Sequence, residues 1–188
     1  MATTPKKALS VLLVTGFIIG FMVSLSSSCP TRCEKEILWT LFARQIGGGT
    51  NRNQEQSVPP VNSTDNTRFG AIVTNNWVVL DAPVPAGKIV AHARGTHTKA
   101  GPAAGDWFTS LSIVFEGARF NGSTFQIMGI TDIGGQWAIV GGTGELALAQ
   151  GTIKHKAIIQ ADPENYRQLD IHAFYTPQAV SGNAIAIE

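Results

Sequence analysis

The glycine-rich segment Val140–Leu146 is the first place where residue types and spacing could do chemistry. Its Gly-Gly-Thr-Gly core would cradle a phosphate only if a Lys and a Ser or Thr followed and opened a helix. Glu145 follows instead, and its carboxylate would repel a phosphate. The flanking runs 138–140 and 146–148 have strand character. The segment therefore predicts a hairpin turn and not a nucleotide site.

The four histidines do not form a pattern typical of a metal site. His92 and His97 are five residues apart on an expected strand and therefore face opposite ways. His155 and His172 have no acid or cysteine at ligand spacing beyond Asp170. The chain also has no Gly-x-Ser-x-Gly segment, which argues against a Ser/His/Asp hydrolase. We expect neither a metal nor a hydrolytic triad.

Charge and length narrow the class of protein. The 188 residues carry 14 Lys and Arg against 13 Asp and Glu, a nearly neutral balance. A nucleic-acid partner would favour a basic stripe with interleaved aromatics, so we expect none. The length fits one domain with a sizeable core behind a leader.

The N-terminal residues predict export. Lys6 and Lys7 form a positive start, residues 8–25 are uncharged and mostly apolar, and residues 26–28 are serines. An uncleaved signal anchor is the alternative, because this apolar run nearly spans a bilayer and Gly16 and Gly20 form a small-residue face. We expect residues 1–28 to be a signal peptide and residues 29–188 the mature, extracytoplasmic domain.

Export bears on the two cysteines and on two sequons. Cys29 and Cys33 are the only cysteines, and in an oxidising compartment they could close a small local disulfide loop. Asn62 and Asn121 begin Asn-x-Ser/Thr sequons in expected surface loops. Both are predicted N-glycosylation sites.

From about Ile37 onward the sequence has the pattern of strands and turns. A long polar loop is expected over 47–68. Strands are expected over residues 37–45, 69–80, 88–98, 107–116, 123–129, 136–140, 145–159 (broken or bulged) and 166–175. Eight short antiparallel strands at regular spacing predict an all-β closed barrel, wide enough to surround one small ligand.

Alternation within these strands predicts one inward and one outward face. Residues 107, 109, 111, 113 and 115 share one face of their strand, and residues 169, 171, 173 and 175 share one face of the last strand. The sequence leaves open which of the two faces points into the barrel.

The order of several motifs resembles the plant dirigent family, over nearly everything after Glu36. The similar segments are 69–73 (FGAIV), 78–83 (VVLDAP), 89–95, 115–129 (FEGARFNGSTFQIMG) and 139–151 (IVGGTGELALAQG). The resemblance implies an eight-stranded antiparallel barrel, related to the allene oxide cyclase-like barrels that cyclise oxidised fatty acids. It also implies secretion to the apoplast, frequent N-glycosylation and a homotrimer.

The function implied by this resemblance is stereochemical control. Dirigent proteins hold phenoxy radicals or quinone methides made by a separate oxidase, so that coupling or cyclisation gives one stereoisomer, and they need no oxidising cofactor. We therefore expect a secreted barrel that binds a small phenolic or terpenoid intermediate. The alternatives are a non-catalytic ligand-binding or cell-wall structural barrel and a stand-alone cyclase.

The resemblance also implies polar groups at four positions. Lignan-forming members have an acid at the end of the first strand, where Arg44 stands here, and a tyrosine after the third strand's glycine, near His97. Asp132 matches a second acid, and Gln136 stands near a missing arginine. We expect Asp132 to be the acid, with a pKa raised by apolar enclosure, and His97 to replace the tyrosine.

These candidates have structural alternatives. Asp132 could serve only a turn, His97 could be a half-exposed histidine at a strand end, and Arg44 could face solvent. The tryptophans at 77, 107 and 137 could wall a pocket or pack in the core. Further candidate substrate contacts are Arg44, Gln136, Trp107, Phe115 and His172.

Overall fold

The structure is a computed structural model that describes residues 34–64, 66–117, 119–132 and 134–177. The expected signal peptide over 1–28, its anchor alternative and the Cys29–Cys33 pair all lie outside the described residues. Within the described ranges, no helix is long and apolar enough to cross a membrane.

The described residues form nine strands and one short 3₁₀ helix. They are β1 (Lys35–Ile46), β2 (Gln54–Val58), β3 (Ile72–Leu80), β4 (Ile89–Lys99), β5 (Trp107–Phe115), β6 (Thr124–Ile130), β7 (Gln136–Thr143), η1 (Gly144–Leu146), β8 (Gln150–Ala161) and β9 (Glu164–Tyr175). This order matches the predicted succession of strands, with β2 and η1 as additions.

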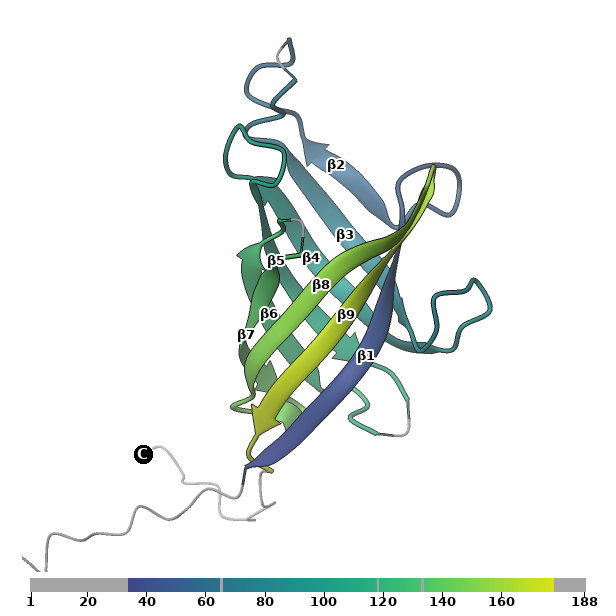
Figure 1. Cartoon of the computed structure of the whole chain (residues 1–188), viewed down its shortest axis with the longest axis vertical. Helices are drawn as coiled ribbons and strands as arrows, with labels where there is room; N and C mark the ends of the chain where they lie inside the picture. Colours follow the sequence, from purple (N-terminus) through teal and green to yellow (C-terminus); the bar gives the residue numbers. More distant parts are fainter. Residues whose placement is uncertain (1–33, 65, 118, 133, 178–188) are drawn as a thin grey trace, which may run out of the picture. The chain divides into compact units, whose positions relative to one another are not determined.

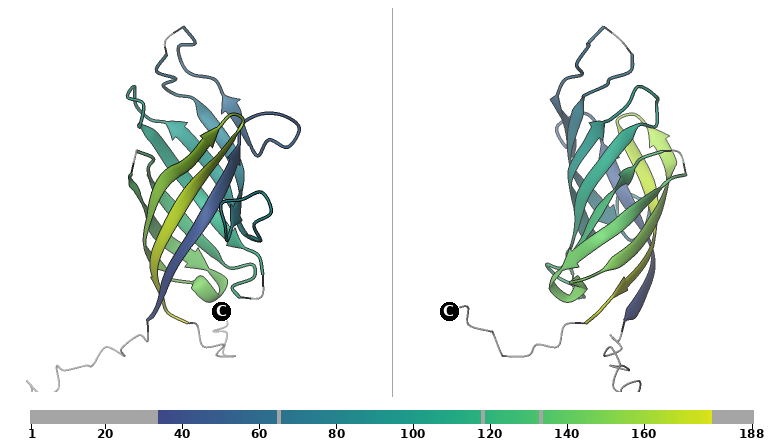
Figure 2. Two further views of the ribbon diagram at one scale, coloured as in Figure 1. Left: turned by 45° about the vertical axis from the view of Figure 1, so that its right-hand side comes forward. Right: turned by 90° about the vertical axis from the view of Figure 1, so that its left-hand side faces the viewer.

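Eight of these strands close into an antiparallel barrel (Figures 1 and 2). Neighbours run β1-β9-β8-β7-β6-β5-β4-β3, and β1 pairs with β3 to close the ring. The closing contact is short, from Phe42 opposite Leu80 to Arg44 opposite Val78, whereas β1 pairs with β9 along its whole length. The predicted all-β, eight-stranded antiparallel barrel is confirmed.

Two local expectations are wrong. The polar segment 47–68 was expected to be a loop throughout, but Gln54–Val58 forms β2 and pairs with the edge of β3. Residues 146–148 were expected to begin a strand, but η1 occupies Gly144–Leu146 and β8 starts only at Gln150. Gly144 permits this turn because its φ of +64° lies in the left-handed region.

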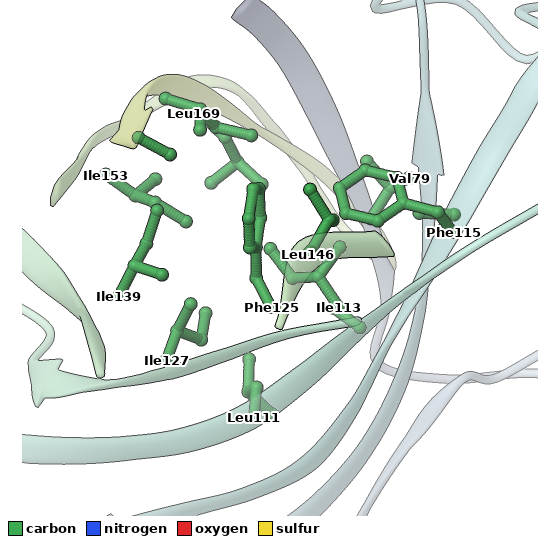
Figure 3. Packing of buried hydrophobic residues seen from close by; sticks show 14 of the residues in the cluster. Val79, Leu111, Ile113, Phe115, Phe125, Ile127, Ile139, Leu146, Ile153 and Leu169 are labelled. Atoms are coloured by element: carbon green, nitrogen blue, oxygen red, sulfur yellow. The ribbon is translucent and has the colours of Figure 1, made fainter. Parts of the chain in front are cut away.

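The barrel interior is filled at the end where η1 lies. The inward faces of the strands supply a cluster of buried apolar side chains, and Leu146 from η1 is buried within that cluster (Figure 3). The faces that begin with Trp107 on β5 and with Leu169 on β9 are the inward ones. Close packing of this kind fills the centre of this half of the barrel, and a pocket of about 300 Å³ remains at its side, lined by Trp39, Leu41, Val90 and Phe115 among others.

Gly151 allows β8 and β9 to approach closely. Its φ is +153°, and a Cβ placed there would lie 2.1 Å from the carbonyl oxygen of His172 on β9. Only glycine fits such a contact, and glycines in strands commonly mark the bends that a closed barrel needs.

Candidate ligand cavity at one end of the barrel

A cavity of about 400 Å³ lies in the other half of the barrel, near the end of β1 and the start of β9. This volume suits a small organic ligand. The cavity is lined by side chains from six strands and from the loops near β2, β4 and β6: Gln45, Gln54, Arg68, Val73, Trp77, His97, Ala104, Gly105, Trp107, Thr131 and Arg167.

Hydrogen bonds fix two tryptophans around this end of the barrel. The Trp77 indole Nε1 donates to Gln54 Oε1 at 2.8 Å, so β2 helps to orient a residue of β3. The Trp137 Nε1 donates to Thr131 Oγ1 at 3.1 Å, and the Thr131 hydroxyl is also hydrogen-bonded to that of Thr109. Both indole rings are buried, so the aromatic walls are rigid and their N–H groups are satisfied.

His97 lines the cavity, and one of its buried ring nitrogens has no hydrogen-bond partner among the described residues. Its Nδ1 lies 3.3 Å from the Thr96 carbonyl oxygen, which can only accept, so Nδ1 carries the proton of the neutral ring. The Nε2 atom is buried and has no hydrogen-bond partner among the described residues. Burial, and secondarily the charge of Arg167, lowers the pKa of His97 to about 4. At neutral pH the ring is therefore uncharged, and its Nε2 carries a lone pair that can accept a hydrogen bond.

Arg167 is held behind His97 by a second histidine. Its Nη1 donates to His155 Nδ1 at 2.8 Å, and His155 stacks on Trp137 with ring centroids 4.1 Å apart. Burial, followed by the charges of Arg167 and His97, lowers the pKa of His155 to about 4. Burial also lowers the pKa of Arg167 from its usual value. Because His155 is neutral, it accepts the Arg167 hydrogen bond without repelling its charge.

Of the sequence-predicted residues, His97 and Trp107 line the cavity. Asp132 does not line it. Its carboxylate lies against Gly105 in the cavity wall, since a Cβ added to Gly105 would come within 2.6 Å of Asp132 Oδ1. Gln136 is exposed at the start of β7.

The other three predicted contacts lie away from this cavity. Arg44 points outward from β1 and makes a two-pronged ion pair with Glu164, at 2.9 and 2.7 Å. Phe115 packs in the filled half, with its ring 5.6 Å from that of Trp39. His172 is exposed on β9 and bonds Glu36 at 2.8 Å. The structure therefore does not bring these three side chains to the cavity.

Sequence reasoning missed Arg167, Gln54 and His155, although a signal for two of them exists. Arg167 is two residues before Leu169, and His155 is two residues after Ile153, so both share the parity of an inward apolar face. Extending the alternation through polar residues would have placed both inside the barrel. Gln54 carries no comparable signal, because β2 has no alternating pattern.

The predicted glycosylation sites Asn62 and Asn121 are both exposed, in the β2–β3 and β5–β6 loops. Asn62 Oδ1 accepts hydrogen bonds from the backbone and hydroxyl of Thr64. In the part of the chain that the structure describes, no three His, Cys, Asp or Glu side chains are grouped so that they could hold a metal ion.

The chain is thus an eight-stranded antiparallel β-barrel with one filled half and an aromatic, polar cavity in the other. A sequence model of the family described as "Dirigent-like protein" matches residues 38–174. The chain belongs to the dirigent-like protein family.

One curated protein and two solved structures are also similar to this chain. Dirigent protein 1 of Arabidopsis thaliana is 30% identical over 92 residues, which are 47% of this chain and 50% of the relative. The chain thus matches about half the length of this curated relative. The pterocarpan synthase dirigent proteins GePTS1 and PsPTS1 each superpose with a TM-score of 0.69, at 22% and 23% identity. The superpositions cover 76% and 77% of this chain, and 92% and 97% of the respective relatives. At such identities the likeness shows a shared fold.

Proposed function

We propose that this protein binds a small phenolic or terpenoid reactive intermediate and directs its coupling or cyclisation to one stereoisomer, without oxidising the intermediate itself. The observation that carries this proposal is the aromatic cavity, which is large enough for one such molecule and is lined by the neutral His97 ring. Membership in the dirigent-like family and the fold shared with two pterocarpan synthase dirigent proteins support it.

Stereochemical control of this kind requires orientation. A planar intermediate lying against Trp77 or Trp107 would expose one face to attack, which turns a random encounter into a single geometry. A tenfold preference for one enantiomer needs only about 1.4 kcal/mol of difference between two transition states. Rigid walls and one placed acceptor are sufficient for such a difference.

Closure of a quinone methide illustrates the proton chemistry that we propose. A hydroxyl oxygen of the intermediate bonds to the exocyclic carbon, the ring regains aromaticity, and the former carbonyl oxygen gains a proton. His97 Nε2 takes the proton that the attacking hydroxyl loses. The step is redox-neutral and needs no oxidant, and we propose that a separate oxidase forms the intermediate beforehand. Asp132 remains our proposed acid, acting from beside Gly105 at the cavity wall.

Chiral analysis of products tests the proposal. The protein is incubated with coniferyl alcohol and a one-electron oxidase, and the coupling products are separated by chiral chromatography. We expect an enantiomeric excess that depends on the protein. A racemic product rules out monolignol coupling. Stereoselective product from a preformed quinone methide without oxidase, together with racemic coupling of coniferyl alcohol, favours a stand-alone cyclase, and no effect on either substrate favours the non-catalytic barrel.

Replacement of His97 by Phe tests the acceptor. The variant keeps an aromatic ring beside Trp77, whose centroid lies 4.7 Å from that of His97, but removes Nε2. We expect most of the selectivity to disappear while the fold remains. His172→Phe is the matched control, because His172 is exposed on the outer face of β9. Equal selectivity in wild type and His97→Phe would remove the proposed role.

Asp132→Asn tests the proposed acid separately. The substitution keeps the size of the side chain but removes its ability to exchange a proton. We expect the rate of quinone methide closure to fall, whereas binding of the intermediate stays the same. An unchanged rate and selectivity would exclude Asp132 from the reaction.

We also propose that the protein is secreted to the apoplast as an N-glycosylated homotrimer, with residues 1–28 as the signal peptide. The basic and apolar leader supports secretion, and the exposed positions of Asn62 and Asn121 support glycosylation. Expression in a plant secretory pathway, followed by glycosidase treatment and mass spectrometry, tests both. An intact leader or an unmodified pair of asparagines would contradict the respective part.

A further inference from the structure

The side chains that line the cavity carry a net positive charge. Arg68 and Arg167 both line it, and none of the described residues that line it is Asp or Glu. The two histidines near Arg167 are neutral at physiological pH, so they do not add to this charge or offset it. Asp132 lies outside the lining but against Gly105 in the cavity wall, and its charge acts on His155.

Arg167 has a guanidinium N–H donor that no described residue uses. Its contact with His155 uses Nη1, and its Nε is buried without a hydrogen-bond partner among the described residues. A guanidinium has five N–H donors in a planar fork, and a carboxylate matches two of them at once. A buried cation with open donors is costly unless an anion or water completes it. The arrangement therefore favours an anionic ligand group.

Arg68 extends this positive charge towards the β4–β5 loop. Its guanidinium carbon lies 5.1 Å from the centre of the Trp107 ring, and Gln56 Oε1 accepts a hydrogen bond from its Nη2 at 2.7 Å. Lys99 approaches the same ring at 5.5 Å, and its ammonium bonds the Ala103 and Ala104 carbonyls of that loop. An aromatic wall and cationic groups thus lie side by side.

We propose that the intermediate handled by this barrel is an aromatic carboxylate, with its ring against the tryptophans and its carboxylate bound by Arg167 inside the cavity and by Arg68 beside Trp107. This inference rests on the proposed function, which it refines by naming the class of substrate. It distinguishes this barrel from one that is built for a neutral aromatic alcohol.

Binding of a matched pair of ligands tests this inference. Ferulate and coniferyl alcohol have the same ring substituents and differ in a carboxylate against a hydroxymethyl group. We expect ferulate to bind wild-type protein at least about tenfold more tightly in calorimetry at pH 7, since each charge-assisted hydrogen bond contributes enough for such a ratio. The preference should shrink as salt rises if the Arg68 contact is exposed to solvent.

Single substitutions of the two arginines test whether they cause the preference for ferulate. Arg167→Gln and Arg68→Gln should each reduce the ferulate preference about tenfold, with coniferyl alcohol binding nearly unchanged. Arg94→Gln is the matched control, because Arg94 is exposed on β4 and pairs with Glu116 outside the barrel. Circular dichroism checks that each variant is folded. Arg68 is exposed, so its variant remains informative even if Arg167→Gln unfolds.

The outcomes separate this inference from the proposed function. If both ligands bind wild type equally, or if Arg94→Gln lowers the preference as much as the cavity variants do, the carboxylate inference fails and the proposed function stands. If neither ligand binds, both fail. A ferulate preference that the cavity variants abolish supports the inference.

Discussion

At the residue scale, the cavity depends on two histidines that remain uncharged. His97 offers an acceptor to a ligand, and His155 holds Arg167. Both have a pKa lowered to about 4, chiefly by burial. Neutral imidazoles keep the cavity compatible with two arginines, because an imidazolium beside Arg167 would add repulsion in a setting of low dielectric.

These lowered pKa values predict how stability depends on pH. A histidine with an ordinary unfolded pKa near 6.5 binds more protons unfolded than folded between pH 6.5 and 4. The free energy of unfolding should therefore be highest above pH 6.5 and fall as pH decreases towards 4. Urea denaturation at several pH values measures this slope. In His97→Phe the slope should be about half as steep, and an unchanged slope would contradict the burial of His97.

The sequence predicted part of the residue chemistry. His97 and Trp107 were identified by family position and strand alternation, and both line the cavity. Arg44 lies on the outward face of β1, where it pairs with Glu164, in agreement with the solvent-facing alternative for this residue. Arg167 was missed because charged residues are rarely assigned to a barrel interior. Only the three-dimensional neighbourhood of His155 and Trp137 shows how its charge is accommodated.

At the element scale, η1 closes the filled half of the barrel with one side chain. Leu146 is fully buried in the apolar cluster, whereas Leu148, two residues later, is 57% exposed. The sequence could not distinguish the two, because residues 146–148 fit a strand as well as a turn. Likewise, β2 has a polar composition with no alternation, and its pairing with β3 alone makes it a strand.

This difference gives a matched pair of substitutions. Leu146→Ala should lower the free energy of unfolding by about 2–5 kcal/mol, through lost apolar burial and the cavity left behind. Leu148→Ala should change it by less than about 0.5 kcal/mol, as is usual for exposed positions. Chemical denaturation measures both values. Similar losses in the two variants would mean that η1 does not anchor the end of the barrel.

At the scale of the whole molecule, the spacing of the turns, the number of strands and the order of the motifs predicted the eight-stranded barrel. These features change little when the bounds of a single strand are wrong. The oligomeric state of the barrel does not follow from them. The outer surface of β6 and β7 nevertheless bears an apolar strip, with Met128, Ile130 and Val140 all exposed. Strips of this kind are typical of surfaces that are covered by another molecule.

We expect this strip to be part of the proposed trimer interface. Val140→Glu would place a charge in the interface and should convert the trimer to monomers, which light scattering detects as a threefold fall in mass. Val84→Glu is the control, since Val84 is also exposed, at 47% against 56%, but lies in the β3–β4 loop. A monomeric wild type, or a trimeric Val140→Glu variant, would refute this assignment.

The buried apolar cluster at the η1 end closes the cavity on one side. The cluster blocks passage along the barrel axis, and Arg68 and the β4–β5 loop border the cavity at its other end. Ligand entry and product release at this end can then limit turnover even when bond formation is fast.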